Sequence, residues 1–187
     1  MSEKFTLILF LTAISILVFH NLYVELIPPT KWEQRNISDE EKKVWFNILP
    51  HLKGTPYKLG GQSIKTGFDC SGLIIYLYNK IGVKWFKYKS SLVKDVSANN
   101  LYWYNVKKIS FAQIEKGDLI FFDTDNDGKI DHVAIFDKLD KVGNIWVWDA
   151  TTEPDGIKIY AVTNRIIKNF WQKRPLFGKP LKVSKIY

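Results

Sequence analysis

Cys70 is the only cysteine of this 187-residue chain, and its surroundings suit a reactive thiol. It stands where a glycine-rich loop meets an apolar helical pattern, in the stretch GFDCSGLIIYLYNKIG. A thiol in the first turn of a helix faces unpaired backbone N–H groups and the positive end of the helix dipole, which favour the nucleophilic thiolate. A buried, inert cysteine is the alternative, and the polar neighbours Asp69 and Ser71 argue against it. We therefore expect Cys70 to act as a nucleophile.

A nucleophilic cysteine needs a general base, and histidine is the usual one. The chain has three histidines. His20 lies in an apolar N-terminal segment, and His51 follows a predicted helix, where a surface or capping role is expected. His132 opens a predicted strand, and a strand end presents its side chain at the edge of a site. We therefore predict that His132 is the base.

Asp149 is the candidate third group, which would orient the imidazole of His132. The segments HVAIFDK and NIWVWDA are typical of a hairpin closed by the turn DKVG. Pairing of Leu139 with Asn144 would close this turn. His132 would then lie opposite Thr151, and Asp149 would be a diagonal neighbour on the same face, within side-chain reach. An even-length turn keeps this parity, whereas an odd loop or a bulge breaks it. Alternatively, Asp149 ends the strand or pairs with a lysine.

The acidic stretch DTDNDGKID lies directly before His132. Its spacing of carboxylates around a glycine matches most of a calcium loop of the EF-hand type. The candidate calcium ligands are Asp123, Asp125, Asp127 and Asp131. The last ligand position, where such a loop has a bidentate glutamate, falls on Ala134. The pattern predicts either a weak calcium site that orders this turn or an ordinary turn rich in Asp, Asn and Gly.

Hydrophobic periodicity predicts two helices followed by strands. Ser38 and Glu41 have the spacing of a capping box at the start of an amphipathic helix over residues 38–52. A second helix is predicted over residues 70–82, after a glycine-rich loop, and residues 84–114 have no clear pattern. Short β-branched and aromatic segments between turn residues predict strands at 117–123, 132–138, 144–150 and 156–162. This order predicts an α+β fold with an antiparallel sheet.

The ends of the chain differ from its middle. Residues 1–27 are strongly apolar and are typical of a signal peptide or a membrane anchor, with a buried helix as the alternative. Residues 28–36 are expected to form a linker, and residues 37–187 one domain with a basic C-terminal extension. The net charge is +8, and no acidic residue follows Asp155. Such an extension would bind anionic polymers or a membrane, or only aid solubility. Nucleic acid is not an expected partner, because no recognition motif accompanies the charge.

Three blocks of the sequence, in this order, resemble the NlpC/P60 family of papain-like cysteine peptidases. The blocks are GTPYKLGG with GFDCSGLIIYLYNKIG, then IEKGDLIFFD, then DHVAIF. The resemblance implies a papain-like NlpC/P60 fold, with N-terminal helices packed on an antiparallel sheet. The chain departs from the family pattern at Leu59, where Trp is usual, and at Asp149, where many members have His.

The resemblance implies a cell-wall hydrolase that cleaves an amide bond in bacterial peptidoglycan stem peptides, of the γ-D-glutamyl-diamino acid type. Cys70 would be the nucleophile, His132 the base and Asp149 the third polar residue. The resemblance also implies substrate-binding roles for the loop tyrosine and the two residues beside the cysteine, which are Tyr57, Asp69 and Ser71. We expect an exported monomer of the cell envelope that needs no cofactor. The alternatives are an amidase or acyltransferase on another envelope substrate, and a non-catalytic envelope-binding protein with this fold.

Overall fold

The computed structural model describes residues 14–15, 27–152 and 160–186. The predicted signal peptide or membrane anchor therefore lies almost entirely outside the described residues. Within the described ranges, no helix is both long enough and apolar enough to cross a membrane.

The two predicted helices are present, together with a third. The α2 helix spans Asp39–Leu52, and the predicted capping box closes its start, because Ser38 and Glu41 exchange side-chain and backbone hydrogen bonds. Pro50 lies inside the last turn of α2 and does not end it. The α3 helix spans Cys70–Lys80, and the short α4 helix spans Ala98–Tyr104 within the unassigned region.

A seven-stranded antiparallel sheet forms the centre of the fold, in the order β1-β11-β7-β8-β9-β10, with β6 also paired to β11. Its strands are β1 (Trp32–Asn36), β6 (Val106–Ile109), β7 (Leu119–Phe122), β8 (His132–Leu139), β9 (Ile145–Thr151), β10 (Ala161–Ile166) and β11 (Leu176–Lys185). Two small hairpins lie apart from it, formed by β2 (Gln62–Ser63) with β3 (Gly67–Phe68) and by β4 (Phe86–Tyr88) with β5 (Ser91–Val93). Short 3₁₀ turns η1 and η3 cover Phe111–Gln113 and Phe170–Lys173.

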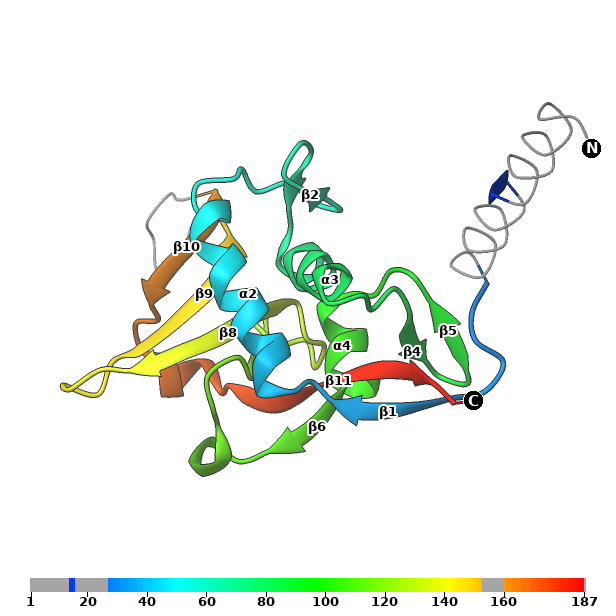
Figure 1. Ribbon diagram of the computed structural model, residues 1–187. Coiled ribbons are helices and arrows are strands. Elements are labelled where there is room, and N and C mark those ends of the chain that lie inside the picture. Colours follow the sequence, from blue (N-terminus) through cyan, green and yellow to red (C-terminus); the bar gives the residue numbers. More distant parts are fainter. Residues whose placement is uncertain (1–13, 16–26, 153–159, 187) are drawn as a thin grey trace, which may run out of the picture.

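Both faces of the sheet are apolar. Side chains alternate along each strand, so Phe121 and Ile135 face the helices while Phe122 and Ala134 face the other side. The helix side holds the larger core, which includes Trp45 and other fully buried residues of α2 and α3. Figure 1 shows α2, α3 and α4 gathered over this side of the sheet. The observed architecture confirms the predicted α+β fold.

Several segment boundaries differ from the predicted ones. Residues 28–36, predicted as a linker, contain β1, which pairs along its length with the end of β11. The fourth predicted strand, at 156–162, falls mostly on residues outside the described ranges, and the described strand β10 begins only at Ala161. The predicted C-terminal extension contains β11, which lies between β1 and β7 and so belongs to the interior of the sheet (Figure 1).

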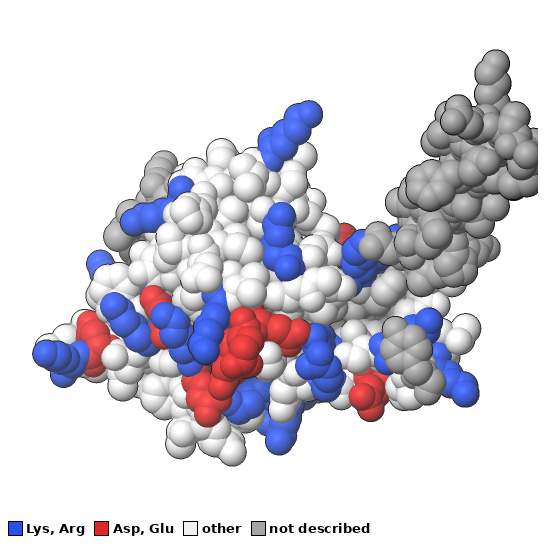
Figure 2. All heavy atoms as spheres, in the orientation of Figure 1, with Lys and Arg blue, Asp and Glu red and all other residues white. Residues whose placement is uncertain are grey.

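The basic residues of the C-terminal region do not form a separate tail. Lys179 pairs with Glu115 and Asp118, and Lys182 pairs with Glu41. These partners come from earlier parts of the chain, so several of the predicted surface charges are used within the domain. Figure 2 shows acidic side chains between basic ones near the start of α2, not a face of a single sign. Attraction to anionic polymers therefore stays a prediction. Fewer unpaired basic side chains are available for it than the sequence alone suggests.

Candidate active site

Asp69 fixes the start of α3, and with it the position of Cys70. Asp69 is the N-cap residue, and its carboxylate accepts hydrogen bonds from the backbone N–H groups of Gly72 and Gly60, both at 2.6 Å. It also accepts a hydrogen bond from the Ser71 hydroxyl at 3.0 Å. One side chain therefore joins the glycine loop to the first turn of the helix and holds Cys70 at its first position.

Cys70 itself is only 8% exposed and lies on the wall of a cavity. Its thiol donates a hydrogen bond to the backbone carbonyl of Asp131, with an Sγ–O distance of 3.7 Å. The first turn of a helix has backbone N–H groups without intrahelical partners, and these stabilise a thiolate or an oxyanion. The predicted position of the thiol at a helix N-terminus is confirmed.

The structure also brings His132 and Asp149 together. His132 Nε2 and Asp149 Oδ2 are 2.9 Å apart, and the Asp149 side chain is fully buried. This contact leaves the other imidazole nitrogen, Nδ1, for the thiol of Cys70. The arrangement is the one that a thiol nucleophile needs, with a base and a third group that fixes the tautomer of the base.

The predicted strand register is correct at the site and wrong at the turn. Ile135 pairs with Trp148, which is the register that sets His132 opposite Thr151. At the turn, however, Leu139 pairs with Ile145 and not with Asn144, so the loop has an odd length. A β-bulge between Phe136 and Lys138 adds one residue to β8. The odd loop and the bulge each exchange the two faces on which the side chains of the hairpin lie. Together they therefore restore the predicted arrangement at His132.

Arg165 is a fourth member of this group. It lies on β10, where it pairs with Val147, so it is a diagonal neighbour of Asp149 from the side opposite to His132. Its guanidinium makes two hydrogen bonds to the Asp149 carboxylate, Nε to Oδ1 at 3.1 Å and Nη2 to Oδ2 at 2.7 Å. Asp149 thus lies on the middle strand of three, between two cationic partners.

The charges in this group shift two pKa values. Burial lowers the pKa of His132, but its hydrogen bonds to Asp149 and Cys70 outweigh burial and raise that pKa to about 10. Burial would raise the pKa of Asp149, but its contacts with His132 and Arg165 hold that pKa below its usual value. The charged forms of both side chains are therefore favoured at neutral pH.

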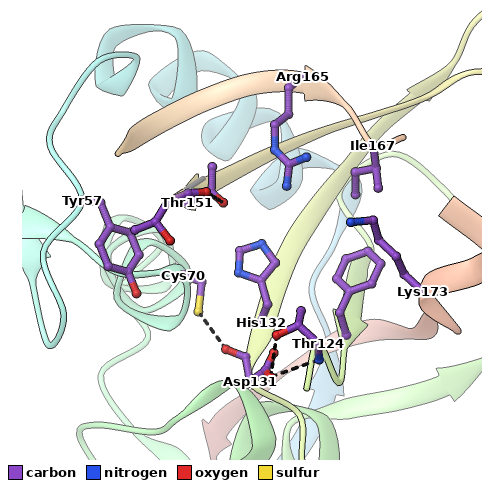
Figure 3. Close-up of a pocket in the computed structure, with 11 residues that line it drawn as sticks. Tyr57, Cys70, Thr124, Asp131, His132, Thr151, Arg165, Ile167 and Lys173 are labelled. Atoms are coloured by element: carbon purple, nitrogen blue, oxygen red, sulfur yellow. Dashed lines mark hydrogen bonds between the residues drawn. The ribbon is translucent and has the colours of Figure 1, made fainter. Parts of the chain in front are cut away.

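A cavity of about 450 Å³ opens in front of these groups. It is lined by Tyr57, Cys70, Phe122, Thr124, Asp131, His132, Thr151, Thr152, Arg165, Ile167 and Lys173. Figure 3 shows Cys70 and His132 on the same wall of this cavity, with Tyr57 beyond the thiol and Lys173 on the far side. Partial burial, with the negative charges of Cys70 and Asp69, raises the pKa of Tyr57, which therefore stays protonated as a hydrogen-bond donor.

Of the predicted substrate-binding residues, Tyr57 lines the cavity, whereas Asp69 and Ser71 do not belong to its lining. The Asp69 carboxylate is instead engaged with the backbone of the loop and the helix. A direct role of these two residues in substrate binding therefore stays a prediction.

Sequence reasoning missed two cationic residues of the site, Arg165 and Lys173. Both belong to the basic C-terminal region, for which the charge pattern predicts only a surface role. The sequence signal that could have revealed Arg165 is the alternation of side chains in AVTNRI. This alternation extends the strand beyond its predicted end at Val162 and places Arg165 on the same face as Thr163.

The acidic loop closes the connection from β7 to β8. Carboxylate oxygens of Asp123, Asp125 and Asp131 come within 4.8 Å of one another. Asp127 is not part of this cluster, and its carboxylate accepts hydrogen bonds from the backbone and side chain of Lys129. The position of the expected glutamate, Ala134, is buried in β8. Neither alternative is decided by this geometry, and calcium binding stays a prediction.

The fold and this site define an α+β domain with a Cys–His–Asp group at a helix N-terminus. The model of the NlpC/P60 family matches residues 54–176, and the chain belongs to this family. It is 32% identical over 132 residues to murein DD-endopeptidase MepH of Escherichia coli, covering 70% of this chain and 42% of MepH. It is 34% identical over 128 residues to the probable peptidoglycan endopeptidase LytE of Bacillus subtilis, covering 68% of this chain and 31% of LytE. The chain thus spans less than half the length of these relatives.

Solved structures agree with this assignment. An NLP/P60 family protein of Staphylococcus aureus, described as similar to a lipoprotein, superposes with a TM-score of 0.55 at 29% identity, covering 80% of this chain and 42% of that one. The NlpC/p60 domain of the peptidoglycan hydrolase SagA superposes with a TM-score of 0.50 at 22% identity, covering 74% of this chain and 97% of that domain. The second likeness concerns the fold alone.

Proposed function

We propose that this protein is a cell-wall hydrolase, a cysteine peptidase that cleaves an amide bond in peptidoglycan stem peptides. The observation that carries the proposal is the thiol of Cys70 at a helix N-terminus, on a cavity wall with His132, whose imidazole is bound to Asp149. The names of two relatives, the murein DD-endopeptidase MepH and the probable peptidoglycan endopeptidase LytE, support this substrate class. Within it, we propose the bond between γ-D-glutamate and the diamino acid.

The mechanism is acyl transfer through a thioester. The Cys70 thiolate attacks the carbonyl carbon, and the charge that develops on the oxygen is stabilised by the N–H groups at the start of α3. The His132 imidazolium donates its proton to the leaving amine. A water molecule, deprotonated by His132, then attacks the thioester, releases the acid and restores the thiolate of Cys70 beside the imidazolium of His132. Asp149 stabilises the imidazolium throughout.

Location and partners follow from the substrate. We propose that the protein acts in the bacterial cell envelope after export, on the stem peptides of the wall. Its mixed surface charge permits contact with anionic wall polymers, and the proposed mechanism uses no metal.

Digestion of purified sacculi tests the proposal directly. Wild-type protein is expected to release fragments whose new ends, identified by mass spectrometry, are γ-D-glutamate and the free amine of a diamino acid. Cys70→Ser serves as the matched control, and it is expected to release none. Loss of whole stem peptides would instead indicate an amidase, and transfer without hydrolysis an acyltransferase. Binding of sacculi without any new ends would support a non-catalytic protein.

The pH dependence of cleavage should reflect the raised pKa of His132. Because this pKa is about 10, the imidazolium that protonates the leaving amine persists through neutral pH and is lost as the pH rises through about 10. Cleavage is therefore expected to stay high well above the ordinary histidine range and to fall near pH 10. Initial rates on a defined muropeptide would measure this, with circular dichroism at each pH to exclude unfolding. A basic limb close to pH 7 would contradict the assignment of the proton donor.

A further inference from the structure

Asp149 lies buried between two cationic side chains. Its side chain has no exposed surface, and its two carboxylate oxygens receive hydrogen bonds from two cationic side chains. Oδ2 is shared by His132 Nε2 at 2.9 Å and Arg165 Nη2 at 2.7 Å, while Oδ1 is held by Arg165 Nε at 3.1 Å. Among the described residues, Arg165 therefore makes two of the three hydrogen bonds to this carboxylate.

The sheet registers place these partners on one face. Asp149 lies opposite Thr163 on β10, and Arg165 is two residues further along the same strand. The Arg165 side chain is only 13% exposed, so its ion pair with Asp149 is largely shielded from water. A planar guanidinium that binds a carboxylate through two hydrogen bonds fixes the plane of the carboxylate as well as its charge.

A buried carboxylate without a cation is costly and tends to take up a proton. In its neutral form, Asp149 would no longer stabilise the imidazolium of His132. With only the single contact to His132, its plane would also be free to rotate. Arg165 prevents both protonation and rotation of Asp149, because its positive charge stabilises the carboxylate and it donates a hydrogen bond to each oxygen.

We propose that Arg165 is a positioning residue of this site, which keeps Asp149 ionised and oriented so that Asp149 can hold the imidazole of His132. This inference rests on the proposed function, because it assigns His132 the role of proton donor and base. It assigns Arg165 no contact with the scissile bond.

A double-mutant cycle tests this role. Arg165→Gln is expected to lower kcat for muropeptide cleavage about a hundredfold and to change KM less than about threefold. Arg165→Lys keeps the positive charge but cannot bind both carboxylate oxygens through a planar guanidinium. It is expected to retain about tenfold more activity than Arg165→Gln. Asp149→Asn is expected to lower kcat at least as much as Arg165→Gln, and adding Arg165→Gln to it should cost less than about a further threefold. Arg35→Gln, at a half-exposed arginine far from Asp149 in the sheet, is the matched control and is expected to keep wild-type kcat.

A second readout needs no substrate. The rate at which iodoacetamide alkylates Cys70 reports the thiolate, which the imidazolium stabilises. This rate is expected to fall about tenfold in Arg165→Gln and not to fall further in the double variant. Arg165→Lys repeats both measurements in case Arg165→Gln does not fold.

The outcomes separate this inference from the proposed function. Wild-type protein that cleaves no stem peptide would overturn the proposed function, while the alkylation cycle would still decide the role of Arg165. A raised KM with unchanged kcat would assign Arg165 to substrate binding and overturn its positioning role. Independent losses in the double variant, in cleavage or in alkylation, would overturn it as well.

Discussion

Replacing Cys70 by alanine is expected to lower stem-peptide cleavage at least about 10⁴-fold. Every step of the proposed mechanism passes through the Cys70 sulfur, and in this chain no second cysteine can take its place. The helix N-terminus and His132 would remain, but without a nucleophile they can only polarise the substrate. Comparison of kcat/KM for the wild type and Cys70→Ala on one defined muropeptide gives the measurement.

The same variant should keep its fold. Apart from its contact with His132, Cys70 makes a long sulfur hydrogen bond to the carbonyl of Asp131, and its replacement by alanine removes a single heavy atom. The midpoint of thermal unfolding is therefore expected to stay within a few degrees of the wild type, since a change of about 1 kcal/mol moves it by only about 2–4 °C in a chain of this size. Substantial cleavage by a folded Cys70→Ala protein would show that the thiol is not the nucleophile.

Replacing Gly72 by alanine is expected to destabilise the protein by about 3 kcal/mol or more, a large change for one methyl group. A Cβ on Gly72 would lie 2.0 Å from the backbone oxygen of Gly61 and 3.1 Å from the Asp69 carboxylate. Both neighbours belong to the link between the glycine loop and α3, in which Asp69 N–H also donates to the Gly61 carbonyl. Backbone cannot move aside as a flexible side chain can, so the start of the helix must shift.

Gly82→Ala is the matched control, because Gly82 follows the other end of the same helix. Its Cβ would meet no atom within 4 Å, and its φ of +78° adds only the strain of a left-handed conformation, about 1–2 kcal/mol. Denaturant unfolding of both variants gives the two free energies, and the alkylation rate of Cys70 shows whether the thiol has moved. Equal stability of Gly72→Ala and the wild type would mean that loop and helix are less tightly joined than the structure describes.

The parts of the fold that the sequence predicts well are those with local signals. The capping box of Ser38 and Glu41 marks the start of α2, and the step from a glycine loop to an apolar helix marks Cys70. The prediction that His132 and Asp149 lie together depends on the hairpin of β8 and β9. In a hairpin, whether the offset between the strands is odd or even decides which residues share a face. That parity is correct only because the bulge near Asp137 compensates for an odd loop, a combination that periodicity does not reveal.

The parts that the sequence does not predict depend on distant partners. β1 has no strong strand pattern and forms because β11, at the other end of the chain, pairs with it. Arg165 looks like one more surface charge until β10 is placed beside β9, where the arginine meets a buried carboxylate. The roles of Asp69 and Ser71 in substrate binding and of the acidic loop in calcium binding depend on ligands, and they stay predictions.

The position of β11 also constrains the order in which the domain can assemble. It is the last strand of the described residues, yet it joins β1 and β6 to the strands that carry the site. Until residues 176–185 are in place, β7 has an open edge and β1 lacks the strand with which it pairs in the folded domain. Completion of the sheet is thus tied to the placement of β11. Before β11 is in place, Cys70 and His132 would belong to a domain whose central sheet is incomplete.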